Sequence, residues 1–207
     1  RLSGKSNSLS GYKCNMVNLR THFGGLGNRL FQLAYVYAQA RKGEIPDIYL
    51  QDEKYFEPYA NEFRTILREG LSPVDMVSVH VRRGDYLNNP FYVNLQDTDY
   101  YEKALTEFPN EKFLIFCADR QWGSDDEGDM EWCKQHFKGR DFTFYQGKDE
   151  IEDFNAMASC KGHILANSSF SFWAAYVSGN KTVAPSKWFT EPAIGKPPTL
   201  PNSWIKI

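Results

Sequence analysis

From residue 76 to residue 184, short apolar segments alternate with amphipathic ones, and this order limits the possible folds more than any other feature of the sequence. The apolar segments have the length of buried strands, and the segments between them carry apolar residues at helical spacing. Strands are expected at 76–82, 112–118, 142–145, 163–166 and 182–184, and helices at 99–107, 127–137, 150–159 and 170–177. This order predicts a parallel sheet covered by helices on both faces.

The first third of the chain predicts a smaller α/β unit. Strands are expected at 16–23 and 48–50, and helices at 29–42 and 55–69. Gly70 and Pro73 end the last helix and mark a domain boundary. We therefore expect one domain at 12–73, a second at 74–190 and an irregular, proline-containing tail at 191–207.

Composition restricts the class of protein. The chain has 207 residues, 42% of them hydrophobic and 24% charged, as expected for a folded globular protein. A net charge of -2 without a basic stripe argues against nucleic acid as a partner. No apolar run is long enough to span a membrane, which favours a soluble domain in the cytoplasm over a secreted one. The polar, serine-rich start suggests that the chain belongs to a longer multidomain protein.

The run V-S-V-H-V-R-R-G-D-Y at residues 77–86 joins a strand to a charged turn. Its valines alternate with polar residues, so His80 and Arg82 are expected on one face of the strand. Arg82 and Arg83 come at its carboxyl end, where open α/β sheets bind ligands. Two guanidinium groups there indicate a phosphate or diphosphate ligand, because arginine can hold such oxygens with two parallel hydrogen bonds. The alternative is a surface turn in which Arg83 and Asp85 form a solvated pair.

A glycine-rich segment, G-G-L-G-N at residues 24–28, lies between a predicted strand and a predicted helix. A turn of this kind can bring backbone amides and a helix N-terminus to an anion, with Gly25 and Asn28 as the candidate residues. The spacing fits neither the dinucleotide nor the P-loop fingerprint. The alternative is a tight structural turn with Asn28 as a helix cap.

A second strand–helix junction carries Asn167, Ser168 and Ser169. Hydroxyls and free amides converge there on the positive end of a helix, which also suits phosphate. An ordinary serine cap is the alternative.

Two carboxylates are candidates for recognising a nucleoside. Asp119 follows the predicted strand at 112–118, and Asp153 lies in a predicted helix. Both can accept hydrogen bonds from a guanine edge or a ribose; the alternative is that they are capping or surface acids. The acidic residues at 125–129 lack the spacing of a metal loop, so no metal site is predicted. His163 has no candidate partner for catalysis and is expected to be structural.

Three motifs in a fixed order carry a resemblance: G-G-L-G-N-R-L-F-Q, V-S-V-H-V-R-R-G-D-Y and I-L-A-N-S-S-F-S-F-W-A-A-Y. Together they resemble the alpha-1,2-fucosyltransferase family over residues 19–207. The resemblance implies a GT-B-like fold, an α/β architecture of two Rossmann-like domains with parallel sheets. It also implies transfer of L-fucose from GDP-fucose to a sugar acceptor with inversion, forming an alpha-1,2 linkage to galactose, with no cofactor or metal required. The stretch before the second motif is shorter than in the family, so the N-terminal acceptor domain is abbreviated.

The resemblance also implies roles for single residues. Arg82 would bind the diphosphate, with Ser168 and Ser169 on the phosphates; His80 would shape the nucleotide pocket and Asp153 would meet the guanine. Asp85 is a candidate base for the acceptor hydroxyl, the alternative being that it holds Arg83 or caps the turn. Two other functions stay open: an inverting transferase for a different nucleotide sugar or acceptor, and a non-catalytic sugar- or nucleotide-binding module.

Overall fold

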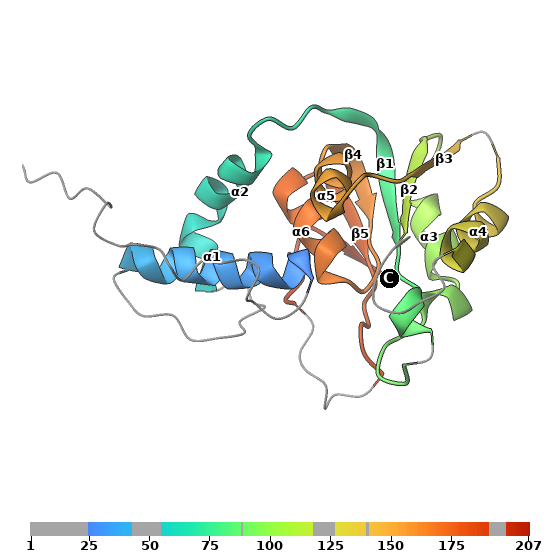
Figure 1. The fold of residues 1–207 in the computed structure, drawn as a ribbon, viewed down its shortest axis with the longest axis horizontal. Coiled ribbons are helices and arrows are strands. Elements are labelled where there is room, and N and C mark those ends of the chain that lie inside the picture. The colour runs from blue at the N-terminus through green and yellow to red at the C-terminus, as the bar shows by residue number, and fades with distance from the viewer. Residues whose placement is uncertain (1–24, 43–54, 88, 118–126, 140, 191–197) are drawn as a thin grey trace, which may run out of the picture.

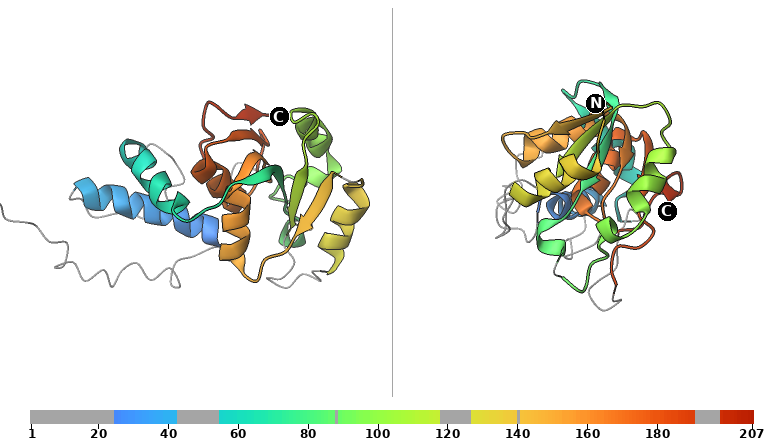
Figure 2. Two further views of the ribbon diagram at one scale, coloured as in Figure 1. Left: turned by 90° about the horizontal axis from the view of Figure 1, so that it is seen from above. Right: turned by 90° about the vertical axis from the view of Figure 1, so that its right-hand side faces the viewer.

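The computed structural model describes residues 25–42, 55–87, 89–117, 127–139, 141–190 and 198–207. In this part of the chain, one sheet lies between two layers of helices (Figures 1 and 2). Helices α3 (Tyr100–Thr106) and α4 (Glu127–His136) cover one face. The other face carries α5 (Glu150–Ala158) and α6 (Ser169–Ser178), with α1 (Leu26–Lys42) and α2 (Ala60–Arg68) packed outside α6. The predicted α/β class is confirmed.

The sheet has six parallel strands in the order β3-β2-β1-β4-β5-β6. Their bounds are β1 Val74–Val81, β2 Phe113–Cys117, β3 Phe142–Tyr145, β4 Cys160–Ile164, β5 Lys181–Ala184 and β6 Ile205–Lys206. The chain runs outward from β1 to β3 and then returns to the other side of β1 with β4. The order therefore reverses between β1 and β4, which is the position where open sheets of this class bind their ligands.

Strand β1 shows why the alternating sequence gives this arrangement. Val77, Val79 and Val81 are buried toward α3 and α4. Ser78 and His80 point to the opposite face, toward α5 and α6. Polar residues at every second position thus point toward the layer formed by α5 and α6.

The aromatic side chain of Trp173 in α6 joins the N-terminal helices to the sheet domain. Its ring centroid lies 4.9 Å from that of Phe31 in α1 and 5.6 Å from that of Phe63 in α2. Phe56 stacks on it at 5.6 Å, just before the short 3-10 helix Glu57–Tyr59. Between residues 25 and 73 the described segments hold helices and no strand; the strands predicted at 16–23 and 48–50 lie outside the described residues. The division at residue 73 stays a prediction.

The end of the chain differs from its predicted irregular course, because Ile205–Lys206 forms the edge strand β6 beside β5. Ile207 donates its amide hydrogen to the carbonyl of Ala184, and the buried ring of Trp204 lies 5.2 Å from that of Phe172. A two-residue strand has no periodicity to detect, so the sequence did not indicate it. Strand β4 also begins earlier than predicted, at Cys160 instead of residue 163.

A buried polar pair lies between the sheet and α6. His163 is fully buried, and its Nδ1 is 2.8 Å from the hydroxyl oxygen of Ser78. Burial lowers the pKa of His163 to about 3, so the ring is neutral in the folded protein. This agrees with the structural role expected for it.

We expect His163→Gln to weaken the acid sensitivity of the fold. The unfolded chain takes up a proton at His163 near the ordinary pKa of 6.5, whereas the folded chain does so only near pH 3. Above pH 6.5, His163 therefore does not change the free energy of unfolding. As the pH falls from 6.5 toward 3, His163 lowers this free energy by up to about 1.4 kcal/mol per pH unit. Urea unfolding across this window should show a shallower slope for the variant. His136→Gln, on the exposed side of α4, is the control; equal slopes for His163→Gln and wild type would refute the prediction.

Candidate functional site

A cavity of about 700 Å³ opens at the carboxyl edge of the sheet. Its wall is made by the ends of β1, β2 and β3 and by the N-terminal ends of α1, α5 and α6. Eight of the residues predicted from the sequence line it: Gly25, Asn28, His80, Arg82, Asp85, Asp153, Ser168 and Ser169.

His80 lines the cavity near the end of β1. Its side chain is packed 5.8 Å from the ring of Phe170, and the residue is 6% exposed. Burial, with a smaller contribution from the charge of Arg82, lowers the pKa of His80 to about 3. Its Nδ1 has no hydrogen-bond partner among the described residues. The ring is therefore neutral and offers a buried nitrogen to a ligand.

Arg82 extends from β1 into the cavity. Its Nη2 donates to Oδ1 of Asp85 at 2.7 Å, and its guanidinium lies 5.3 Å from the ring centroid of Tyr86. Gly84, with a φ of +46°, turns the chain sharply enough to bring Asp85 back to Arg82. The carboxylate thus holds the guanidinium on the cavity wall.

The alternative in which Arg83 pairs with Asp85 is wrong. Arg83 donates from Nε to Oδ1 of Asp129 in α4 at 3.0 Å, and its guanidinium lies 4.5 Å from the ring centroid of Trp132. Successive side chains of a strand point to opposite faces, so Arg83 follows Val81 toward α4 while Arg82 follows His80 into the cavity.

The N-terminal ends of α1 and α6 meet at the cavity. Helix α1 begins at Leu26, earlier than predicted, so Gly27 and Asn28 lie in its first turn. A Cβ at Gly27 would come within 2.2 Å of the backbone of Ser169, so only glycine permits this approach. Ser169 donates its hydroxyl to Oδ1 of Asn28 at 2.7 Å, while Ser168 caps α6 by accepting from the Phe170 amide at 3.3 Å. Two positive helix ends therefore face one space.

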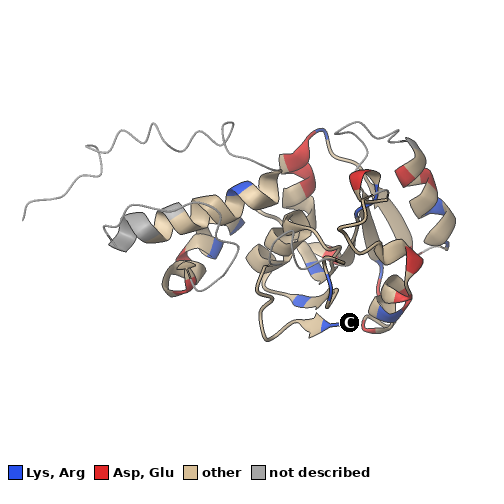
Figure 3. Ribbon diagram, turned by 90° about the horizontal axis from the view of Figure 1, so that it is seen from below, with Lys and Arg blue, Asp and Glu red and all other residues tan. Residues whose placement is uncertain are grey.

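The end of the cavity next to β3 is lined by carboxylates from the start of α5, where Figure 3 shows Asp and Glu positions gathered on the ribbon. Asp153 accepts a hydrogen bond at Oδ1 from the amide of Gly147 at 2.7 Å. Asp149 caps α5 by accepting from the amides of Ile151 and Glu152. Arg29 of α1 pairs with Glu150, which closes the wall between α1 and α5.

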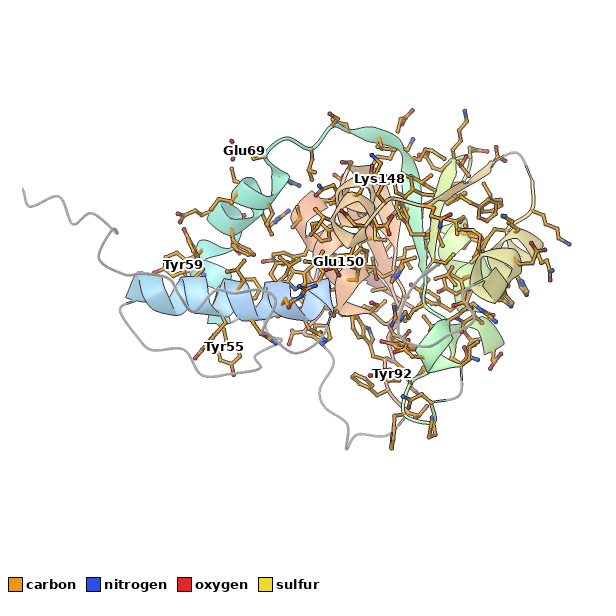
Figure 4. The ribbon with its side chains drawn as sticks, in the orientation of Figure 1. Tyr55, Tyr59, Glu69, Tyr92, Lys148 and Glu150 are labelled. Atoms are coloured by element: carbon orange, nitrogen blue, oxygen red, sulfur yellow. The ribbon has the colours of Figure 1, made fainter. Side chains whose placement is uncertain are left out.

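Two aromatic rings form the opposite end. Tyr86 and Tyr92 stack with ring centroids 3.9 Å apart and an interplanar angle of 16°. Figure 4 shows Tyr92 well separated from Lys148, which lies just before α5. The cavity therefore has an acidic end, a central region with Arg82 and two helix ends, and an aromatic end.

Two predicted residues have other positions. Asn167 is 2% exposed and does not line the cavity; its amide donates to the carbonyl oxygens of Val93 and Trp188, both at 2.9 Å. Asn167 therefore joins the loop at Val93 to the segment at Trp188 and supports the cavity wall from behind. Asp119 lies outside the described residues. No group of three or more His, Cys, Asp or Glu among the described residues could hold a metal ion.

Sequence reasoning missed several residues that line the cavity. They lie in the loop after β1, at the end of β3 and in the loop that follows β3, and they include Tyr86, Tyr92, Tyr145, Gly147 and Lys148. The rule that ligands bind at the carboxyl ends of parallel strands indicates both loops, but it does not say which side chains turn inward.

The chain belongs to glycosyl transferase family 11, whose model matches residues 15–207. It is 30% identical to the alpha-1,2-colitosyltransferase of Escherichia coli over 80% of this chain and 63% of that relative. It is 30% identical to the O-antigen biosynthesis glycosyltransferase WbnK of Escherichia coli over 63% of this chain and 44% of the relative. Human galactoside alpha-(1,2)-fucosyltransferase 1 is 32% identical over 56% of this chain and 32% of its own length.

These relatives confirm the resemblance to the alpha-1,2-fucosyltransferase family. The chain spans from 32% to 63% of the length of the three relatives. No solved structure matches it. Within the described ranges, no helix combines the length and apolar character needed to cross a membrane.

The close contact between α1 and α6 gives a test of the site's architecture. We expect Gly27→Ala to lower the free energy of unfolding by about 1–3 kcal/mol, because a backbone neighbour cannot move aside as a flexible side chain can. Gly25→Ala is the matched control, since a Cβ there meets nothing within 4 Å. Thermal and urea unfolding of both variants measure the difference; equal stability would contradict the contact.

Proposed function

We propose that this chain carries the transferase activity of an alpha-1,2-fucosyltransferase. It would move L-fucose from GDP-fucose to a hydroxyl of a glycan acceptor, with inversion, forming an alpha-1,2 linkage to galactose. The observation that carries the proposal is the cavity where Arg82 faces the N-terminal ends of α1 and α6. A cation and two positive helix ends at the reversal point of a parallel sheet suit a diphosphate.

The central groups of the cavity suit the charge that develops in the reaction. The bond between the sugar's anomeric carbon and the diphosphate oxygen breaks, and its electron pair stays on the diphosphate. Arg82 and the helix ends that carry Gly25, Asn28, Ser168 and Ser169 would stabilise this charge. His80 is neutral, so it would contribute a hydrogen-bonding nitrogen but no further positive charge.

The acceptor oxygen forms the new bond to the anomeric carbon and loses its proton. Asp85 is the proposed base, since its half-exposed carboxylate lies on the cavity wall beside Arg82. The same carboxylate also orients Arg82 through the 2.7 Å ion pair. The reaction as proposed requires no metal ion, because Arg82 and the helix ends supply the positive charge.

The acidic end of the cavity suits the nucleobase. Guanine presents N–H donors that a carboxylate can accept, and Asp153 lies in the wall at that end, held through Gly147. The base would then lie near β3, and the diphosphate near β1.

The larger architecture is also part of the proposal. We assign residues 74–190 to the nucleotide-sugar domain of a GT-B-like pair, and residues 12–73 to an abbreviated acceptor-side unit. A soluble cytoplasmic domain of a longer protein remains the proposed setting.

A second candidate is a transferase of the same fold with another nucleotide sugar. It is favoured by the relative named as a colitosyltransferase, which matches over 80% of this chain. A non-catalytic binding module would bind the nucleotide without turnover. Assays of sugar transfer and of donor hydrolysis separate these alternatives.

Nucleotide preference tests the donor assignment. We expect GDP to raise the unfolding temperature more than UDP or ADP does. Asp153→Ala should weaken GDP binding by about tenfold or more and leave UDP unchanged, because a guanine edge would lose its acceptor. In Asp153→Asn, the side-chain oxygen can still accept the hydrogen bond from the Gly147 amide, but the NH2 group would face the N–H donors of guanine. This variant should therefore bind GDP as weakly as Asp153→Ala does. Restoration by Asn would show that Asp153 only anchors the loop.

The two arginines provide a matched pair. Arg82→Lys keeps the charge but loses the planar fork, so we expect a fall in turnover of about 10²-fold or more together with weaker GDP binding. Arg83→Lys should lower thermal stability more than GDP affinity, because Arg83 pairs with Asp129 and lies over Trp132, away from the cavity. Near-normal GDP affinity and turnover in Arg82→Lys would exclude Arg82 as the diphosphate ligand.

A further inference from the structure

The aromatic end of the cavity is built as a rigid surface. Tyr86 donates its hydroxyl to the carbonyl of Asn167 at 3.2 Å, and its ring stacks against Tyr92. The ring of Tyr92 also meets that of Phe189 at 5.3 Å, on the segment that follows β5. Both tyrosines line the cavity, so part of each ring is accessible from its interior.

The backbone fixes the same loop on both sides of Tyr92. Val93 donates its amide hydrogen to Trp188 at 3.1 Å, and Thr190 donates to Phe91 at 2.9 Å. The amide of Tyr92 also bonds to the carbonyl of Asn89 at 3.3 Å. Because folding already orders these rings, a ligand that contacts them loses little further conformational freedom.

The position of this wall follows from the order of groups along the sheet edge. Asp153 and Gly147 lie at the β3 end, Arg82 lies at β1, and Tyr92 is bonded to the segment beyond β5. A nucleotide sugar has the same linear order of base, diphosphate and sugar. With the base at β3 and the diphosphate at Arg82, the sugar extends toward Tyr92. Burial, with a smaller contribution from the charge of Asp85, raises the pKa of Tyr92.

We propose that Tyr92, supported by Tyr86, receives the pyranose ring of the donor and selects a 6-deoxyhexose. This inference rests on the proposed function. An aromatic face packs well against the methyl group of L-fucose. The same aromatic face forms few hydrogen bonds. A sugar that carries a hydroxyl on C6 would therefore lose the hydrogen bonds that this hydroxyl makes to water without gaining equivalent ones from the protein.

The decisive comparison uses three ligands that share the nucleotide: GDP, GDP-fucose and GDP-L-galactose, which differs from GDP-fucose by one hydroxyl at C6. Calorimetric titration of the wild-type chain should show GDP-fucose binding more tightly than GDP-L-galactose. Tyr92→Ala should weaken the binding of GDP-fucose by about threefold to tenfold and change the affinity for GDP by less than about twofold. The variant should then no longer prefer GDP-fucose over GDP-L-galactose. Tyr92→Phe keeps the ring and should behave like wild type.

Phe91→Ala is the matched control, because Phe91 lies in the same loop, is 46% exposed and does not line the cavity. It should leave all three affinities unchanged. An equal loss of GDP and GDP-fucose in Tyr92→Ala would overturn the inference, as would an unchanged GDP-fucose affinity with a raised KM for the acceptor. The same loss in Phe91→Ala would assign the effect to the loop as a whole.

Failure of the proposed function looks different. In that case the wild-type chain itself would bind GDP no better than UDP, before any substitution at Tyr92 is considered. That result overturns both proposals, whereas a normal wild-type profile with an unaltered Tyr92→Ala variant overturns the inference alone.

Discussion

The backbone of α1 at Gly27 lies directly against the backbone of α6 at Ser169, and the form of the cavity depends on this contact. It brings two helix N-termini to one point beside the end of β1. Helix α6 can hold this position because it is buried along its length, with Trp173 packed among rings from α1, α2 and the preceding segment. Packing far from the cavity therefore fixes the positive end of α6 within it.

The cavity separates its chemistry by position. Carboxylates gather at the start of α5, where each also has a structural partner: Asp149 caps the helix, Glu150 pairs with Arg29 and Asp153 holds Gly147. The centre combines the Arg82 guanidinium with a neutral His80. Because His80 is buried without a charge, the positive charge in the centre comes from Arg82 and the helix ends.

Sequence reasoning succeeded where a residue's surroundings are set by its own strand or helix. The alternation of β1 predicted the buried valines and the shared face of His80 and Arg82. Prediction from the sequence failed where a side chain bonds to a residue that is distant in the chain. Arg83 pairs with Asp129, 46 residues away in the chain, and Asn167 bonds to carbonyls 74 and 21 residues away. Spacing within a motif carries no information about such distant partners, so the only partner that the motif offered Arg83 was the nearby Asp85.

The amino-acid sequence by itself determined the parallel α/β class, the strand that leads into Arg82 and the family, because periodicity and motif order are properties of the linear chain. Tertiary structure alone decided that the helix starting at Leu26 meets the one starting at Ser169, and that Tyr92 joins the cavity wall. It also decided that the last residues complete the sheet as β6. These outcomes depend on which surfaces pack together, and packing is settled by shape and burial over the whole fold.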